Sequence, residues 1–200
     1  MRSTVNLSDP RLINVIGEFN VPNLVSGKPS SVGGHISLTI LKRAVNDCVT
    51  SKLSAIITGP ISKFSWHLAG QKWAGHTELL AYLANPKNPP KVRMLLYSED
   101  LMVVLNSVHV PLKDAILSLN ESNLIDTVEI TNRWYIKNFG KKPQIILAAL
   151  NPHAGENGIL GNEEIEILEP VVLKATEYGI RISGPYPADT VFFKNKNNDS

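Results

Sequence analysis

Cysteine is nearly absent from this chain of 200 residues, which contains a single one, Cys48. One cysteine excludes a framework of intrachain disulfides and fits a reducing compartment. The amino-terminal residues lack the apolar stretch of a signal peptide. No apolar run approaches the ~20 residues that a transmembrane helix needs. These absences predict a cytoplasmic protein.

A dominant charge of either sign is also missing. The chain has 20 Lys and Arg residues against 18 Asp and Glu residues, a formal net charge of +2. This balance gives no reason to expect binding to nucleic acid or to a membrane surface. With 43% hydrophobic and 19% charged residues, the composition is that of one globular domain or of an incomplete piece of a larger one.

Several common catalytic motifs are missing as well. Gly155, Gly158 and Gly161 have the spacing G-x-x-G-x-x-G, which differs from the G-x-G-x-x-G of a dinucleotide-binding turn. The chain contains no P-loop, no G-x-S-x-G turn and no H-E-x-x-H pair. Composition and periodicity alone therefore indicate an α/β protein that could hold a two-histidine site.

The sequence does contain a histidine placed just after its most apolar run. Ile145–Leu150 predicts a buried strand, followed by Asn151-Pro152-His153 and a glycine-rich loop that extends to Gly158. In α/β sheets, ligands collect beyond the carboxyl ends of the strands. We therefore expect His153 to face a site.

Further strands are predicted from shorter apolar runs. Val92–Tyr97 and Leu101–Leu105 are separated by three polar residues and indicate a hairpin, so the sheet is predicted to be mixed. Ser54–Thr58 and Arg181–Ser183 each precede a Gly-Pro pair and predict short strands. A weaker pattern over Leu12–Ile16 hints at another.

Four helices are predicted from apolar residues that recur with the helical period. Cys48 belongs to the first face and is interpreted as a small core residue rather than a nucleophile. Gly140 is expected to end the third helix, and Pro170 to kink the fourth. The predicted faces are Ile36, Ile40, Leu41, Ala44, Val45 and Cys48; Leu112, Ala115, Ile116 and Leu119; Leu124, Ile125, Val128, Tyr135 and Phe139; and Ile165, Leu168 and Val172.

Candidate anion-binding residues lie before one predicted helix and after one predicted turn. His76 and Thr77 come before the apolar helix Leu79–Leu83, with Thr77 as its N-cap. The positive end of a helix suits a phosphate or carboxylate, although His76 can equally be a loop histidine bonded to a neighbouring carbonyl. Lys63 follows the turn at 58–60 and is either a contact for an anionic substrate or an ordinary surface lysine.

A metal site is suggested by a second histidine in the same setting as His153. His109 follows the run Leu101–Leu105, and two neutral imidazoles that converge on a cleft are typical ligands of Zn²⁺ or a similar divalent ion. A catalytic zinc normally takes three protein ligands, and Asp189 or Glu156 could lie near the ion. The alternative is a pair of loop histidines hydrogen-bonded to the backbone.

Five short motifs follow one another along the chain. They are Thr58-Gly59-Pro60-Ile61-Ser62-Lys63, Gly75-His76-Thr77-Glu78, His109-Val110-Pro111-Leu112-Lys113-Asp114, Leu150-Asn151-Pro152-His153-Ala154-Gly155-Glu156, and Gly184-Pro185 with Pro187-Ala188-Asp189-Thr190. In this order and at this spacing they resemble the 4-hydroxythreonine-4-phosphate dehydrogenase family of vitamin B6 biosynthesis. The resemblance extends from about Gly34 to Phe193.

The resemblance implies a homodimer with an isocitrate/isopropylmalate dehydrogenase-like fold, in which three α/β/α layers surround a mixed sheet and both chains contribute to the active site. It implies that His76 and Thr77 contact a phosphorylated substrate, and that His109 and His153 bind a divalent metal ion (Zn²⁺, Mg²⁺ or Co²⁺). The implied reaction is oxidation of 4-phosphooxy-L-threonine by NAD⁺ or NADP⁺. Loss of CO₂ then gives 3-amino-2-oxopropyl phosphate for pyridoxal 5′-phosphate biosynthesis.

Members of this family also have a strand and a loop before the position of Met1. They continue beyond that of Ser200, where a third metal histidine and much of the dinucleotide pocket are expected. Residues 1–200 are therefore expected to be a central fragment of the dehydrogenase. Three alternatives stay open: a dehydrogenase for threonate or erythronate 4-phosphate, a metallohydrolase with Glu78 or Glu156 as general base, and a catalytically inactive remnant.

Overall fold

The computed structural model describes Val15, residues 24–73 and residues 75–194. The strand predicted over Leu12–Ile16 lies outside these residues, apart from Val15. The chain divides into two compact units, Met1–Gly75 and His76–Ser200, each with its own packing. Within the described residues, none of the helices combines the length and the hydropathy needed to cross a membrane.

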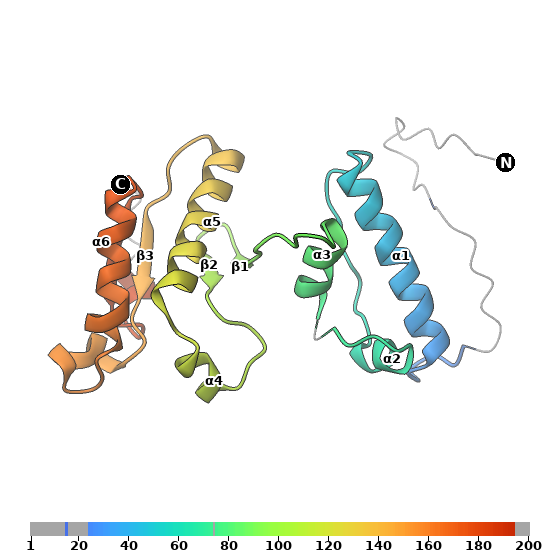
Figure 1. Ribbon diagram of the computed structural model, residues 1–200, viewed down its shortest axis with the longest axis horizontal. Coiled ribbons are helices and arrows are strands. Elements are labelled where there is room, and N and C mark those ends of the chain that lie inside the picture. Colours follow the sequence, from blue (N-terminus) through green and yellow to red (C-terminus); the bar gives the residue numbers. More distant parts are fainter. Residues whose placement is uncertain (1–14, 16–23, 74, 195–200) are drawn as a thin grey trace. The chain divides into compact units, whose positions relative to one another are not determined.

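The first unit contains two helices, α1 (Ser31–Val49) and α2 (Lys63–Leu68), which pack against each other (Figure 1). A serine precedes each of them. The hydroxyl of Ser30 accepts a hydrogen bond from an N–H group of the first turn of α1, and Ser62 does the same for α2. These caps satisfy backbone donors that a helix leaves unpaired at its start.

Close backbone contact and a buried tryptophan join α1 to α2. A Cβ atom at Gly34 would overlap the carbonyl oxygen of Ser65, so glycine lets the two backbones approach. Trp66 is 1% exposed, and its indole N–H donates to the Ser37 hydroxyl at 2.9 Å. The core of this unit is therefore centred on the contact between the two helices.

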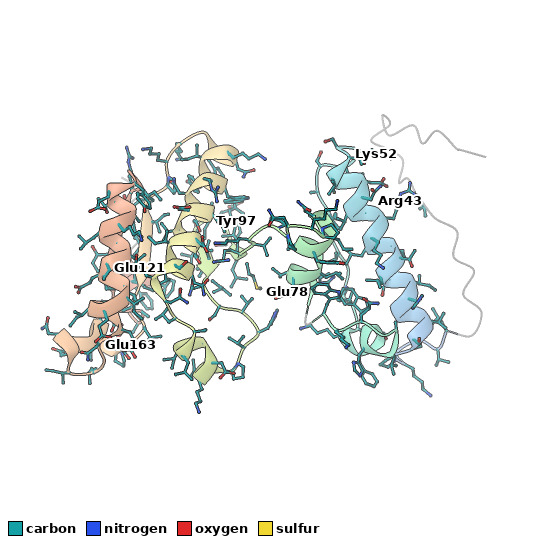
Figure 2. The ribbon with its side chains drawn as sticks, in the orientation of Figure 1. Arg43, Lys52, Glu78, Tyr97, Glu121 and Glu163 are labelled. Carbon is teal, nitrogen blue, oxygen red and sulfur yellow. The ribbon has the colours of Figure 1, made fainter. Side chains whose placement is uncertain are left out.

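A buried carboxylate, Asp47, lies near the carboxyl end of α1. Its side chain is paired with Arg43 (Nε–Oδ2 2.6 Å) and with Lys52 (Nζ–Oδ1 3.5 Å), both labelled in Figure 2. The hydrogen bond from Arg43 is the main cause that lowers the pKa of Asp47, and the Lys52 charge acts in the same direction. Asp47 is therefore held as a carboxylate where α1 ends.

Two predictions for the first unit are wrong. The buried face of α1 includes Leu38, whereas Ile40 is 50% exposed. Residues Ser54–Thr58 form no strand, and Ile57 is 99% exposed. A strand needs a neighbour for its backbone N–H and C=O groups, and none of the described strands pairs with this segment. Cys48 is half-buried on α1.

The second unit begins with α3 (His76–Ala84) and a β-hairpin. Strands β1 (Met94–Tyr97) and β2 (Met102–Leu105) pair antiparallel, with Met94 opposite Leu105 and Tyr97 opposite Met102. The predicted hairpin is thus confirmed. Two helices follow, α4 (Leu112–Leu117) and α5 (Glu121–Phe139).

The rest of the second unit contains a parallel strand pair and two α-helices. Strand β3 (Ile145–Ala148) pairs with β4 (Ile182–Tyr186), and α6 (Glu169–Glu177) lies between them in sequence. A short helix, α7 (Val191–Lys194), follows β4. Parallel and antiparallel pairs therefore both occur, as predicted, but in two separate two-stranded sheets. The fold class is α/β.

The core of this unit lies between α5, α6 and the parallel pair (Figure 1). Gly140 ends α5 with φ 71°, as predicted, because glycine adopts the left-handed conformation without steric cost. The buried core residues are Leu124, Ile125, Val128, Leu168, Val171, Ala175 and Ile180. This core fixes where β3 ends, and so where its following loop begins.

Several predicted helix faces in the second unit are only partly right. Phe139 is exposed, and α4 buries no residue at all. Before α6, Glu164–Leu168 forms a wider π-helical turn, and within α6 Val171 is buried whereas the predicted Val172 is only half-buried. Ile165 is also exposed. The strand predicted over 181–183 continues through Gly184 to Tyr186.

Candidate functional site

The strand β3 ends in a turn with unusual backbone geometry. From His153 to Gly158 all six residues have positive φ, between 46° and 90°. We call Pro152–Gly158 the left-handed turn. Each non-glycine residue in this conformation costs about 1–2 kcal/mol relative to a right-handed one. Such strain persists only where the surrounding structure holds it, and it occurs preferentially at functional sites.

A buried carboxylate holds the entry to the left-handed turn. Glu164, which is 1% exposed, accepts hydrogen bonds at Oε1 from the N–H groups of Leu150 (2.9 Å) and Asn151 (2.7 Å). Its Oε2 accepts a third from the Asn151 side-chain amide at 2.8 Å. Burial alone would raise the pKa of Glu164, but the hydrogen bonds from Asn151 and Leu150 outweigh it and lower the pKa.

Two glycines let the left-handed turn fold against this carboxylate. A Cβ atom at Gly155 would lie 2.7 Å from Glu164 Oε2 and 3.0 Å from the carbonyl oxygen of Gly161. A Cβ atom at Gly161 would overlap the Asn151 amide. The motif predicted to present His153 is therefore a packed structure rather than an open loop, and it leaves the His153 side chain exposed.

His109 also has a left-handed backbone, with φ 57°. It follows β2 and precedes α4, as predicted, and its side chain is exposed. The end of β2 is tied to α5, because the hydroxyl of Thr127 lies 2.8 Å from Asn106 Oδ1 and accepts a hydrogen bond from Arg93 at 2.6 Å. Each candidate metal histidine thus follows a strand and occupies a strained backbone position.

His76 and Thr77 are the first two residues of α3, so both lie at the amino-terminal end of a helix, as predicted. The expectation that Thr77 is the N-cap is wrong, because the helix already begins at His76. His76, Thr77 and Glu78 are half-buried. Within the described residues, Glu78 Oε2 makes no hydrogen bond.

The remaining candidates are exposed. Lys63 is the first residue of α2 and belongs to the first unit. Asp189 lies in the turn between β4 and α7, and Glu156 lies in the left-handed turn. Within the described part of the chain, no group of three or more His, Cys, Asp or Glu side chains is arranged to hold a metal ion. The described residues therefore contain no complete metal site.

Comparison with known proteins places this chain in a family. The family model described as "Pyridoxal phosphate biosynthetic protein PdxA" matches residues 3–200. The chain belongs to this family. The resemblance found in the five motifs is thereby confirmed.

Relatives of known name support the assignment. The 4-hydroxythreonine-4-phosphate dehydrogenase of Desulforapulum autotrophicum is 37% identical over 183 residues, which cover 91% of this chain and 53% of that protein. The D-threonate 4-phosphate dehydrogenase of Salmonella typhimurium is 36% identical over 188 residues, 92% of this chain and 56% of that protein. The chain spans about half the length of the curated relatives it matches.

A solved structure supports the fold. The crystal structure of 4-hydroxythreonine-4-phosphate dehydrogenase from Klebsiella pneumoniae superimposes with a TM-score of 0.80 and 34% identity, over 88% of this chain and 52% of that one. PdxA proteins have an isocitrate dehydrogenase-like fold, so the predicted fold family is confirmed.

Glu164 was not among the site residues predicted from the sequence. A signal for its burial exists in the spacing. Glu164, Leu168, Val171 and Ala175 recur at the helical period and are all buried. A glutamate in register with a buried apolar face requires hydrogen-bond partners, and the strand end supplies them.

Proposed function

We propose that this PdxA-family chain takes part in the NAD(P)-dependent, divalent-metal-requiring oxidation and decarboxylation of 4-phosphooxy-L-threonine to 3-amino-2-oxopropyl phosphate, in pyridoxal 5′-phosphate biosynthesis. The observation that carries the proposal is the match of the family model to residues 3–200. The strained, strand-terminal histidine within that match, His153, gives it a candidate site. We further propose that the chain acts as a cytoplasmic homodimer whose partner contributes to the site.

In this proposal the first residues of α3 bind the phosphate of the substrate. His76 and Thr77 lie in the first turn of a nine-residue helix, whose free N–H groups and dipole favour an anion. Lys63 and Asp189 are additional candidate contacts for the substrate. The supporting observation is that both side chains are exposed in the described structure.

His109 and His153 are the proposed metal ligands. Both are exposed imidazoles in the segments that follow strands β2 and β3, and imidazole suits Zn²⁺. They are fewer than the three protein ligands that a catalytic zinc takes, so these two residues alone make an incomplete donor set. When bound, the ion supplies Lewis-acid polarisation of an oxygen, and the nicotinamide supplies the hydride chemistry.

A second substrate is a specific alternative within the family. The D-threonate 4-phosphate dehydrogenase of Salmonella typhimurium is 36% identical to this chain, and the 4-hydroxythreonine-4-phosphate dehydrogenase of Desulforapulum autotrophicum is 37% identical. These values do not favour either substrate. Family membership does favour a dehydrogenase over the metallohydrolase alternative.

The test is an assay of nicotinamide reduction with both phosphorylated substrates. The chain is assayed alone and together with a polypeptide that supplies the remaining length of the relatives, with NAD⁺ or NADP⁺ and with Zn²⁺, Mg²⁺ or Co²⁺. Reduction that depends on substrate and metal is expected. Turnover without nicotinamide would favour a hydrolase, and no turnover in any combination would favour the inactive remnant.

A further inference from the structure

Glu164 is the most deeply buried acidic side chain that the structure describes, at 1% exposure. Of the four largest fully buried side chains in the described residues, the other three are Trp66, Leu79 and Val171. A carboxylate is costly to bury unless its oxygens are hydrogen-bonded. The buried carboxylate of Glu164 lies at the start of the π-helical turn Glu164–Leu168.

The partners of Glu164 all belong to the segment that leads into the left-handed turn. Its two oxygens accept hydrogen bonds from Leu150 N, Asn151 N and Asn151 Nδ2. The Asn151 amide also donates to Glu163, labelled in Figure 2, at 2.7 Å. Asn151 is therefore fixed by both its backbone and its side chain, two residues before His153.

The carboxylate of Glu164 also packs against the left-handed turn. Glu164 Oε2 would lie 2.7 Å from a Cβ atom on Gly155, which is the third of the six positive-φ residues. Backbone hydrogen bonds also join the turn to its flanking residues: Ala154 N to Asn151 O (3.2 Å), Ile159 N to Glu156 O (3.2 Å) and Leu160 N to Gly155 O (3.0 Å). Glu164 therefore contacts the turn at its entry and again beyond His153.

We propose that Glu164 is a positioning residue for His153: its buried carboxylate hydrogen-bonds Asn151 before the histidine, packs against Gly155 after it, and so holds the strained backbone that presents the imidazole. The inference rests on the proposed function for the role of the imidazole as a metal ligand. The backbone effect can be tested without that role.

The experiment compares Glu164→Gln with Glu166→Gln in the full chain. Glutamine has nearly the same shape as glutamate but carries only one acceptor oxygen. In one orientation of its amide group, the N–H groups of Leu150 and Asn151 lose their acceptor. In the other orientation, the Asn151 side-chain amide loses its acceptor. Glu166 is exposed, so its substitution makes the same change of charge without touching the turn. Glu164→Ala is a harsher variant, and circular dichroism checks that each protein is folded.

Two readouts are needed. The first is the NMR signature of positive φ, a strong intraresidue amide-to-Hα cross-peak, at residues 153–157. The second is the affinity for Zn²⁺ alone, measured by calorimetry. We expect Glu164→Gln to weaken the signature at His153 and Ala154 and to lower Zn²⁺ affinity about tenfold or more. Glu166→Gln should change neither.

The outcomes separate the two proposals. If wild-type protein binds no Zn²⁺ through His153, the proposed metal role fails, and the NMR signature alone decides the role of Glu164. An unchanged signature in Glu164→Gln would overturn the positioning role. So would shifts spread equally over β3 and α6, because they would mean that Glu164 serves the core in general rather than the turn.

Discussion

The side chain of Glu164 binds Asn151 twice, accepting one hydrogen bond from its backbone N–H (2.7 Å) and one from its side-chain amide (2.8 Å). Asn151 directly precedes the left-handed turn, and Glu164 begins the helical segment that follows it. The pair therefore closes the loop that carries His153. A charged hydrogen bond of this kind is stronger than a neutral one.

Gly155→Ala should destabilise the second unit more than Gly140→Ala does. Both glycines have positive φ, 78° and 71°, so alanine at either position meets a backbone cost of about 1–2 kcal/mol. A Cβ atom at Gly140 would meet nothing within 4 Å, whereas one at Gly155 would lie 2.7 Å from Glu164 Oε2. Overpacking adds about 1–3 kcal/mol. Urea unfolding measures both costs, and equal losses would contradict the packing described for the turn.

Ser37 and Trp66 should be energetically coupled. The indole N–H of Trp66 donates to the Ser37 hydroxyl across the α1–α2 contact, and a buried hydrogen bond contributes about 1 kcal/mol. Ser37→Ala, Trp66→Phe and the double variant form a thermodynamic cycle. Unfolding free energies from circular dichroism should show a coupling of about that size. Additive losses would mean that the two side chains do not interact in solution.

The stabilisation that Asp47 gives to α1 should depend on pH. The folded pKa of Asp47 is lowered from an ordinary value of about 3.8, so the stabilisation is complete above that value and is lost as the pH falls through the folded pKa. Wild type should therefore exceed Asp47→Asn in unfolding temperature at neutral pH, and the gap should close in acid. Asp114→Asn, which removes an exposed carboxylate on α4, is the control. A gap that is the same at both pH values would contradict the ion-pair explanation.

The structural elements that are determined by residues close together in the sequence could be predicted from the sequence. The hairpin of β1 and β2 was predictable because two apolar runs flank a short polar turn. The end of α5 was predictable because Gly140 can adopt positive φ without cost. The position of His153 beyond β3 was likewise visible from the break between the apolar run and Asn-Pro.

Elements that depend on distant residues were not predictable in this way. Residues Ser54–Thr58 have the composition of a strand, but a strand exists only where another strand pairs with it. Val171 and Val172 lie three and four residues after the buried Leu168, so the helical period allows either, and only packing in the core makes Val171 the fully buried one. The role of Glu164 depends on hydrogen bonds to Asn151, which no sequence period reveals.

His153→Ala should lower the affinity for divalent metal by at least about 100-fold, since it removes a proposed ligand outright and even an indirect partner is worth 10–100-fold. Elemental analysis and Zn²⁺ titration measure the change. His35→Ala removes another exposed histidine, on α1, and should have no effect. Metal content that is unchanged in the His153 variant would remove this residue from the proposed site.

His76→Ala should raise KM for the phosphorylated substrate and leave the bound metal in place. His76 is the first residue of α3, and a side-chain hydrogen bond to a charged group contributes about 1.5–3 kcal/mol, which corresponds to about a ten- to 150-fold rise in KM. The assay is nicotinamide reduction in the system that shows turnover, with metal content measured on the same samples. His67→Ala, an exposed histidine on α2, is the control. Loss of metal with His76→Ala would instead make His76 part of the metal site, because a residue that binds only the phosphate has no effect on metal content.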